Sequence, residues 1–202
     1  MSPSKRDTQS PLAEICIESH EMAKGKLLHA FSDRVRLPDG RESVREWIQH
    51  PGAVMVLPYF PDEDELLFVR QYRYPVGRAI LEFPAGKLDD GEDALACGRR
   101  EMEEETGWVP EDMVKIQELL PCIGYSDEVI HLYFCEKFHA GRLQLDTGEF
   151  LEPQRLSTTQ ARRRFDAGEF QDSKTLVALA WFFMRQDAQK KSCETQKGHP
   201  NA

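Results

Sequence analysis

The chain has 202 residues, of which 40% are hydrophobic, and this length is enough to bury the core of one globular domain. Its 26 basic and 35 acidic side chains give a formal net charge of −9, and the basic residues are scattered apart from residues 162–164, so a nucleic-acid surface is not expected. Five cysteines without a Cys-x-x-Cys pair argue against a disulfide framework or a zinc site and favour a reducing compartment.

The two ends of the chain are polar and without pattern. We expect residues 1–12 and 187–202 to form flexible tails around a single domain at 13–186. No apolar leader opens the chain, and its longest apolar run, residues 176–184, is too short to cross a bilayer. The expectation is therefore a cytoplasmic protein without a membrane partner.

The first part of the domain has the pattern of β-hairpins. From Glu14 to Gln49 apolar and polar residues alternate around turn signals such as Leu37-Pro38-Asp39-Gly40, which predicts a hairpin-rich antiparallel region over 13–50. Five apolar segments follow, most of them suited to buried strands: residues 53–57, 65–72, 79–83, 114–120 and 129–138.

Two helices are predicted at the end of the domain. Ser157 is a candidate cap for the first, and Asp172 or Ser173 for the second. Strands on both sides of one central helix, with helices closing the chain, predict an α+β fold with an α/β/α sandwich rather than a regular parallel βαβ array.

The central helix lies in the most specific segment of the chain, Gly86 to Trp108. Acidic residues gather where it would begin, and Gly107 supplies a left-handed stop. Glu101, Glu104 and Glu105 lie at i, i+3 and i+4, so three carboxylates share one helical face. Each like-charged pair at this spacing costs about 0.2–0.5 kcal/mol, which predicts a cation opposite them.

All-oxygen ligands suit Mg²⁺, with Mn²⁺ as the alternative cation. The competing interpretation is a solvated acidic helix face, which is the usual role of a run such as EMEEE at 101–105. The surrounding glycines and Arg100 favour the cation site.

The complete spacing is Gly86, five residues, Glu92, seven residues and then residues 100–108. It resembles the signature of the Nudix hydrolase superfamily, and a chance match has a probability on the order of 10⁻⁷ per starting point. The resemblance implies a Nudix fold, a mixed sheet between helices. In the family Glu92 and Arg100 form a structural ion pair, so these two residues, with Gly86 and Gly107, are expected to support the site.

The resemblance extends over roughly residues 30–185 to the ADP-ribose pyrophosphatase and nucleoside-diphosphate-sugar hydrolase branch. The matching motifs are at residues 38–41, 45–46, 50–53, 70–75 and 81–88. They imply a Mg²⁺-dependent pyrophosphohydrolase that cleaves the diphosphate of ADP-ribose or a related nucleoside-diphosphate sugar. The products would be a nucleoside monophosphate and a sugar phosphate.

The branch also implies roles for single residues. Glutamates matching Glu101 and Glu105, assisted by Glu104, hold the metal together with the backbone carbonyl of the residue matching Ala85. Glu104 and Glu105 therefore count as catalytic as well. The general base is expected from a mobile loop at 146–152, where Glu149 stands at the matching place and Glu152 is the reserve candidate.

Arg45 and Arg73, within these motifs, are candidates for binding the phosphates or the terminal ribose. Residues 124–128 match a substrate loop of the branch, whose glutamate, here Glu128, lies near the terminal ribose or sugar and the metals. Trp47 and Tyr125 are candidates for stacking on a base. The planar guanidinium group of arginine can bind two phosphate oxygens at once. The competing interpretation is more common among proteins in general: an arginine forms a surface ion pair, and an aromatic residue packs in the core or in a dimer interface. In the branch the residue matching Arg45 reaches the neighbouring subunit, because N-terminal strands are exchanged. The resemblance thus implies a homodimer formed by 13–50, with 51–186 as the catalytic core.

Two rival functions compete with this hypothesis. One is a nucleotide-binding module without turnover, which has little need for three mutually repelling carboxylates. The other is a Nudix hydrolase of nucleoside triphosphates, which tends to lack the N-terminal hairpin region and the Glu128 loop. Ile123 stands where ADP-ribose enzymes usually carry a proline, so the preferred sugar stays open, as do the attacked phosphorus and the number of metal ions.

Overall fold

A computed structural model describes residues 7–197, with side chains described up to residue 191. The chain begins with an antiparallel N-terminal sheet of β1 (Ile15–Lys24), β2 (His29–Arg36) and β3 (Glu42–Gln49). Gly40 closes the second hairpin, with a φ of 87° and its N–H donating to the Leu37 carbonyl at 2.9 Å. The antiparallel hairpin region expected from the sequence is confirmed.

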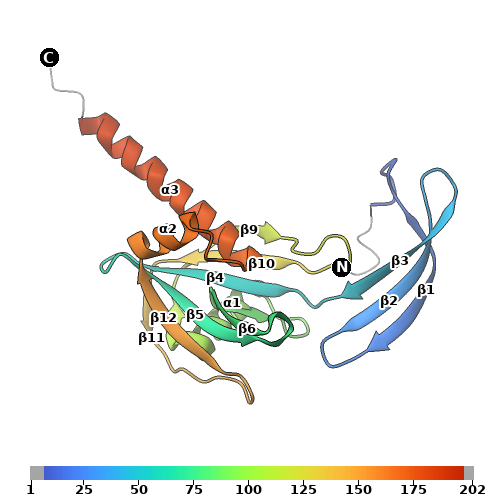
Figure 1. Ribbon diagram of the computed structural model, residues 1–202, viewed down its shortest axis with the longest axis horizontal. Helices are drawn as coiled ribbons and strands as arrows, with labels where there is room; N and C mark the ends of the chain where they lie inside the picture. Colours follow the sequence, from blue (N-terminus) through green and yellow to red (C-terminus); the bar gives the residue numbers. More distant parts are fainter. Residues whose placement is uncertain (1–6, 198–202) are drawn as a thin grey trace.

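The N-terminal sheet stands apart from the body of the molecule (Figure 1). Its link to the body runs through the end of β3, where the Ile48 N–H donates to the Tyr125 carbonyl at 2.8 Å and the His50 N–H donates to Asp127 Oδ1 at 2.8 Å. Within the sheet, Asp33 is buried and accepts a hydrogen bond from the Trp47 indole at 3.0 Å.

The body is built on a mixed seven-stranded sheet in the order β12-β5-β4-β10-β9, with β6 beside β5 and β7 beside β4. β10 runs parallel to β4, and the other paired strands are antiparallel. Its strands are β4 (Ala53–Phe60), β5 (Glu65–Arg73), β6 (Arg78–Glu82), β7 (Ala85–Lys87), β9 (Met113–Leu119), β10 (Ile130–Cys135) and β12 (Leu151–Ser157). A 3-10 turn at Tyr74–Val76 and a two-stranded ribbon of β8 (Trp108–Pro110) and β11 (Phe138–Ala140) complete it. The single strand expected at 129–138 is thus divided between β10 and β11.

Helices cover both faces of this sheet. α1 (Ala94–Thr106) packs on one face, and α2 (Thr158–Asp166) and α3 (Ser173–Lys197) pack on the other (Figure 1). β4 is buried on both sides: Val54 and Val56 face α1, and Met55 and Leu57 face α3. A strand buried on both faces reads as a continuous apolar run. The predicted α/β/α sandwich is confirmed.

The caps of the last two helices are those expected. Ser157 forms a reciprocal capping box with Gln160 at the start of α2, and Asp172 Oδ2 accepts from the Thr175 N–H at 2.9 Å at the start of α3. α3 then runs to Lys197, so residues 187–197 are helical where a flexible tail was expected. This stretch has no glycine or proline to stop a helix, although its apolar periodicity has ended.

Two further findings concern the described part of the chain. None of its helices has the length and apolarity to span a bilayer. The described cysteines, Cys16, Cys97, Cys122 and Cys135, all carry free thiols.

Candidate active site

A pocket of about 540 Å³ opens between the edge of the main sheet and the loop before β12. Its walls come from β4, β5, β7, β10, α1, the start of α3, the loops before β4, β10 and β12, and Leu27 in the turn between β1 and β2. The lining residues with polar or backbone groups relevant to chemistry are His50, Gln71, Arg73, Ala85, Gly86, Lys87, Glu101, Glu128, Asp146, Glu149 and Lys174. The pocket therefore unites segments from both halves of the chain.

α1 carries the acidic wall. Asp93 caps its start by accepting from the N–H groups of Leu95 and Ala96 at 2.9 and 3.2 Å, and Gly107 ends it with a φ of 73°. Between these caps the helical repeat directs Glu101 into the pocket and places Glu105 one turn later, behind β7.

Gly86 makes room for the Glu101 carboxylate. A Cβ atom at position 86 would lie 1.9 Å from both Cδ and Oε1 of Glu101. Any side chain at this position would displace the carboxylate, so the glycine is required by close approach.

Glu105 is only 2% exposed, and its Oε2 accepts a hydrogen bond from the Ala85 N–H at 3.1 Å. Burial, with the nearby Glu101 charge, holds the pKa of Glu105 well above its usual value, and the Ala85 hydrogen bond opposes this shift. Burial also raises the pKa of Glu101, against the opposing effect of Arg100. Negative charge in this wall is therefore undercompensated, which a bound cation would relieve.

Arg100 braces the loop before α1 against the helix. Its Nε and Nη2 each donate to Glu92 at 2.9 Å, and this hydrogen bonding lowers the pKa of Glu92 to about 2. Nη1 also donates to Glu101 at 2.8 Å and to Glu104 at 3.1 Å. Glu104 is thus directed to Arg100 and does not line the pocket.

In the described residues, no three His, Cys, Asp or Glu side chains converge closely enough to form a complete metal site. The reason is visible in the hydrogen bonds of Arg100, which already hold Glu101 and Glu104. The donor chemistry still fits a hard divalent cation. Glu101 and Glu105 offer carboxylate oxygens with raised pKa values, beside the pocket-lining residue Ala85.

A basic wall, formed by Arg73 and Lys174, lines the same pocket. Arg73 donates from Nε and Nη2 to the two carboxylate oxygens of Glu82 at 2.7 and 2.9 Å, and Lys174 bonds to the same carboxylate. Glu82 is 2% exposed, so it is a buried anchor for both cations. Burial tends to lower the pKa of Arg73, but Glu82 outweighs this and raises it. Lys174 also lies 3.0 Å from Asp172. Cations fixed in the same pocket as the Glu101 carboxylate suit a polyphosphate bound with a metal ion.

The loop before β12 brings Glu149 into the pocket. Gln71 Nε2 donates to Glu149 Oε1 at 2.9 Å, and the Glu149 N–H donates to the Asp146 carbonyl at 3.0 Å. Glu152, the reserve candidate, does not line this pocket: it is exposed and pairs with Arg70 at 3.4 Å, beside a different depression.

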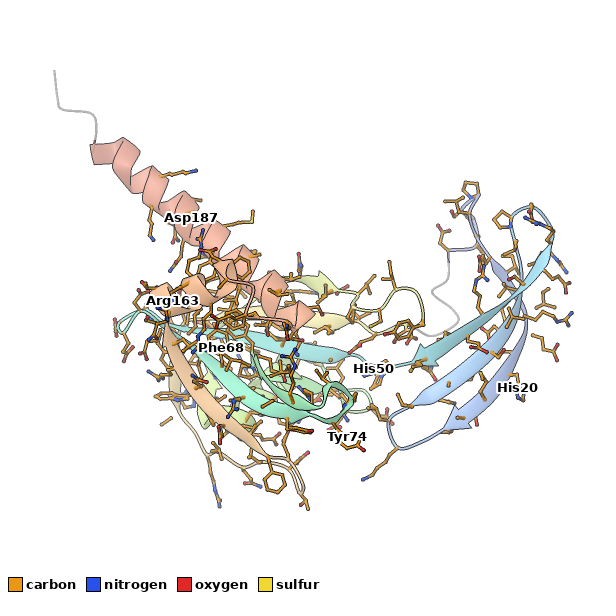
Figure 2. The ribbon with its side chains drawn as sticks, viewed as in Figure 1. His20, His50, Phe68, Tyr74, Arg163 and Asp187 are labelled. Carbon is orange, nitrogen blue, oxygen red and sulfur yellow. The ribbon has the colours of Figure 1, made fainter. Side chains whose placement is uncertain are left out.

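Glu128 also lines the pocket, and its Oε1 lies 3.7 Å from Nδ1 of His50. His50 sits where β3 leads into β4 (Figure 2). The His50 ring Nδ1 accepts from the Gly52 N–H at 3.1 Å, so the proton of the neutral imidazole is on Nε2.

Three substrate-binding candidates lie outside this pocket. Arg45 pairs with Glu14 at 2.6 and 2.8 Å on the N-terminal sheet, and Trp47 donates to Asp33 there. Tyr125 is 56% exposed, and its hydroxyl lies 3.3 Å from the Cys122 sulfur. Within one chain, these side chains are not brought together with Glu101 and Arg73.

The sequence reasoning missed His50, Gln71 and Lys174. Gln71 could have been predicted from the sequence, because side chains alternate along a strand and Gln71 therefore shares a face with Arg73 within the motif at 70–75. His50 lies in the motif at 50–53, but no metal-ligand spacing to another histidine marks it in the sequence. No local sequence pattern could have identified Lys174, because its contact with Glu82 joins positions 92 residues apart.

Comparison with known proteins agrees with this geometry. The family model of the NUDIX domain matches residues 49–178. An ADP-ribose pyrophosphatase of Bacillus subtilis (strain 168) is 34% identical over 180 residues, covering 88% of this chain and 97% of the relative. A GDP-mannose pyrophosphatase of Citrobacter koseri is 30% identical over 144 residues, covering 67% of this chain and 75% of the relative. A crystal structure of an ADP compounds hydrolase has a TM-score of 0.76 at 21% identity and covers 91% of this chain and 98% of its own. The chain therefore belongs to the NUDIX family of hydrolases.

Proposed function

We propose that this protein is a Mg²⁺-dependent pyrophosphohydrolase of ADP-ribose or a related nucleoside-diphosphate sugar. The observation that carries the proposal is one pocket lined by Glu101, Arg73 and Glu149, with the buried Glu105 hydrogen-bonded to the pocket-lining residue Ala85. An acidic wall for a cation and a basic wall for an anion are what a metal-bound diphosphate requires. The names of the pyrophosphatase relatives support the same substrate class.

Glu101 and Glu105, with Glu104 assisting and the Ala85 carbonyl, would hold the cation, with Mn²⁺ as the alternative to Mg²⁺. When bound, the cation neutralises charge on the diphosphate oxygens and acidifies water. Binding requires Glu101 and Glu104 to exchange part of their hydrogen bonding with Arg100. Because Arg100 keeps two hydrogen bonds to Glu92, it stays anchored during this exchange.

Glu149 is the proposed general base. It takes a proton from water as the water oxygen bonds to one phosphorus, and the bond from that phosphorus to the bridging oxygen breaks. Arg73 neutralises charge on the diphosphate, and Glu128 is directed to the terminal ribose or sugar. The products are a nucleoside monophosphate and a sugar phosphate: the attacked phosphorus gains the water oxygen, and the other phosphate leaves with the bridging oxygen.

We also propose a homodimer formed through the N-terminal sheet. Supporting this, the sheet stands apart from the body and carries exposed apolar side chains at Ile15, Met22 and Val44. A three-stranded sheet with so little covered surface needs a partner for stability. In a dimer, Arg45 and Trp47 of one chain could serve the pocket of the other. The free thiols of the described cysteines fit the reducing cytoplasm as the expected location.

A substrate panel tests the activity. Phosphate is measured after coupling to a phosphatase that acts only on monoester products, with Mg²⁺ and ADP-ribose, UDP-glucose, GDP-mannose, NADH or a nucleoside triphosphate. Turnover of a nucleotide sugar is expected, with ADP-ribose preferred. Turnover of nucleoside triphosphates alone would favour a Nudix hydrolase of nucleoside triphosphates, and binding without turnover would favour a nucleotide-binding module.

The base assignment has its own test. Glu149→Gln keeps the hydrogen-bonding shape but lacks a proton acceptor, so kcat should fall at least 100-fold while Mg²⁺ affinity stays within twofold. Glu152→Gln, on the exposed side of β12, is the matched control and should retain the wild-type rate. If Glu149→Gln retained full rate, the base would be another group.

A further inference from the structure

The loop that carries Glu149 is fixed to α1 at its beginning. The N–H groups of Gly141 and Gln144 donate to the carbonyls of Gly107 and Glu104, both at 2.9 Å, and the Arg142 N–H donates to Glu103 Oε1 at 3.2 Å. These bonds tie residues 141–144 to the C-terminal turn of the helix. These hydrogen bonds do not involve the second half of the loop, residues 145–150.

The second half of the loop meets β5 through one side chain. Gln71 Nε2 donates to Glu149 Oε1 at 2.9 Å, and both residues line the pocket. The backbone register agrees with this contact, because Gln71 is paired with Leu151, two residues after Glu149. The hydrogen bond therefore crosses from the middle of a sheet strand to the end of an irregular loop.

Charge works against this position of Glu149. Glu149 and Glu101 line the same pocket, so two carboxylates share a confined space. Like charges in a partly buried pocket repel, so the loop would be displaced outwards unless something held it. Gln71 donates the side-chain hydrogen bond that opposes this displacement.

We infer that Gln71 is a positioning residue that holds the Glu149 carboxylate at the acidic cluster, ready to accept a proton from water. This inference rests on the proposed function, in which Glu149 is the base. Gln71 bonds one carboxylate oxygen, which leaves Oε2 of Glu149 available for the proton. Gln71 itself touches neither the phosphorus nor the water in this role.

An amide suits the role better than a cation would. A carboxamide donates a hydrogen bond without carrying charge, so it orients the carboxylate without placing a positive charge beside it. Arg73, the next residue on the same face of β5, is directed instead to Glu82. The strand thus directs a neutral donor to the proposed base and a charged donor to the buried Glu82.

The alternative is that this hydrogen bond only joins the start of β12 to β5. A purely structural bond would change stability and leave the rate per folded molecule unaffected. A positioning bond would change kcat through Glu149 and leave substrate affinity nearly unaffected. The two roles therefore differ in measurable quantities.

The experiment compares Gln71→Leu, Gln71→Glu and Gln71→Asn with wild type, using ADP-ribose and Mg²⁺. Gln71→Leu removes the donor, and kcat should fall about tenfold with KM within twofold, the scale of one lost orienting bond. Gln71→Glu is nearly isosteric but repels Glu149, so its kcat should fall more than that of Gln71→Leu. Because its shape is close to that of glutamine, this variant tests the inference if Gln71→Leu does not fold. Gln71→Asn keeps the amide and should restore part of kcat.

The matched control is Gln154→Leu on β12, a glutamine that lines a different depression, which should keep the wild-type kcat.

A double-mutant cycle connects the effect to Glu149. In a Glu149→Ala background, Gln71→Leu should cause no further loss of kcat, because the group it orients is absent. Unchanged kcat in both Gln71→Leu and Gln71→Glu, or equal losses with and without Glu149, would overturn the inference.

Hydrogen–deuterium exchange supplies a readout that needs no turnover. Amides of residues 145–150 should exchange at least threefold faster in Gln71→Leu and Gln71→Glu than in wild type, while those of 141–144 stay unchanged. Should wild type turn over none of the substrates, the proposed function fails, and the exchange rates still decide whether Gln71 holds the loop. Equal exchange at 145–150 in all three proteins would contradict the tether.

Discussion

Gly86 and Glu101 show how single residues determine the acidic wall. The carboxylate of Glu101 fills the space where a side chain at position 86 would begin, and Arg100 and Glu92 fix the helix beside it. The glycine therefore does not serve a turn. It permits a charged group to lie against the backbone of β7, next to the Ala85 residue that bonds Glu105.

Gly86→Ala should impair metal binding more than folding. Its Cβ would lie 1.9 Å from the Glu101 carboxylate, so the acid must turn away and the affinity for Mn²⁺ or Mg²⁺ should fall at least tenfold. Calorimetric titration with either metal measures this. Gly25→Ala, whose Cβ has no neighbour closer than 3.5 Å, should bind metal as wild type does. Wild-type affinity in Gly86→Ala would show that Glu101 is not a ligand.

At this scale the sequence predicted the acidic wall but only part of the pocket. Glu101 and Glu105 belong to α1, and Gly86 belongs to β7 shortly before it in the chain, so local spacing was sufficient to relate them. Lys174 and Glu82 meet through the packing of α3 on the sheet, which no local pattern encodes. Arg45 and Trp47 lie outside the pocket of their own chain, so their predicted role depends on a second subunit.

Among the elements, the loop before α1 and the helix are joined by the Glu92–Arg100 pair. The folded-state pKa of Glu92 is about 2, below its ordinary value of 4.5, so this carboxylate stabilises the fold above about pH 4.5. The contribution is lost as the pH falls from about 4.5 to about 2.

Glu92→Gln should therefore lower the free energy of unfolding at pH 7 by roughly 1 kcal/mol, a value discounted for solvent screening. The difference from wild type should shrink steadily below pH 4.5 and vanish near pH 2. Urea unfolding at a series of pH values measures it. Asp112→Asn, which breaks an exposed pair with Lys137, should change stability little at any pH. A constant difference across this range would contradict the assigned pKa.

α3 is tied to the segment that enters the site. The Phe83 N–H donates to Thr175 Oγ1 at 3.0 Å, and Thr175 is fully buried. Thr175→Val leaves that N–H without its acceptor and should cost about 1–3 kcal/mol of unfolding free energy in urea. Thr159→Val on the exposed side of α2 is the control and should stay within about 0.5 kcal/mol of wild type. Equal stability of both variants would show that this contact is not important to the fold.

The elements themselves were largely predictable. Strand and helix periodicity located β4, β5 and α1, and capping residues located the starts of α2 and α3. The end of α3 could not be located, because the polar residues after 186 are compatible with a helix although no apolar face marks them. The break between β10 and β11 was also missed, since Glu136 and Lys137 interrupt an otherwise strand-like run.

For the whole molecule, the separation of the N-terminal sheet from the body leads to a prediction about assembly. Light scattering after gel filtration should give twice the mass of one chain. Val44→Asp, in the exposed apolar surface of this sheet, should shift the protein towards the monomer because it places a charge in the proposed interface. Val114→Asp, equally exposed on β9, should remain dimeric. A monomeric wild type would contradict the proposed assembly.

In the proposed mechanism the carboxylates of α1 hold magnesium for hydrolysis of a diphosphate. The most direct test is the initial rate of nucleoside monophosphate release from ADP-ribose as Mg²⁺ is varied, in wild type and Glu105→Gln. We predict a saturable dependence on Mg²⁺, no turnover in EDTA, and a rate at least 100-fold lower in Glu105→Gln with its fold retained. Turnover of ADP-ribose without a divalent metal, or a wild-type rate in Glu105→Gln, would contradict the account.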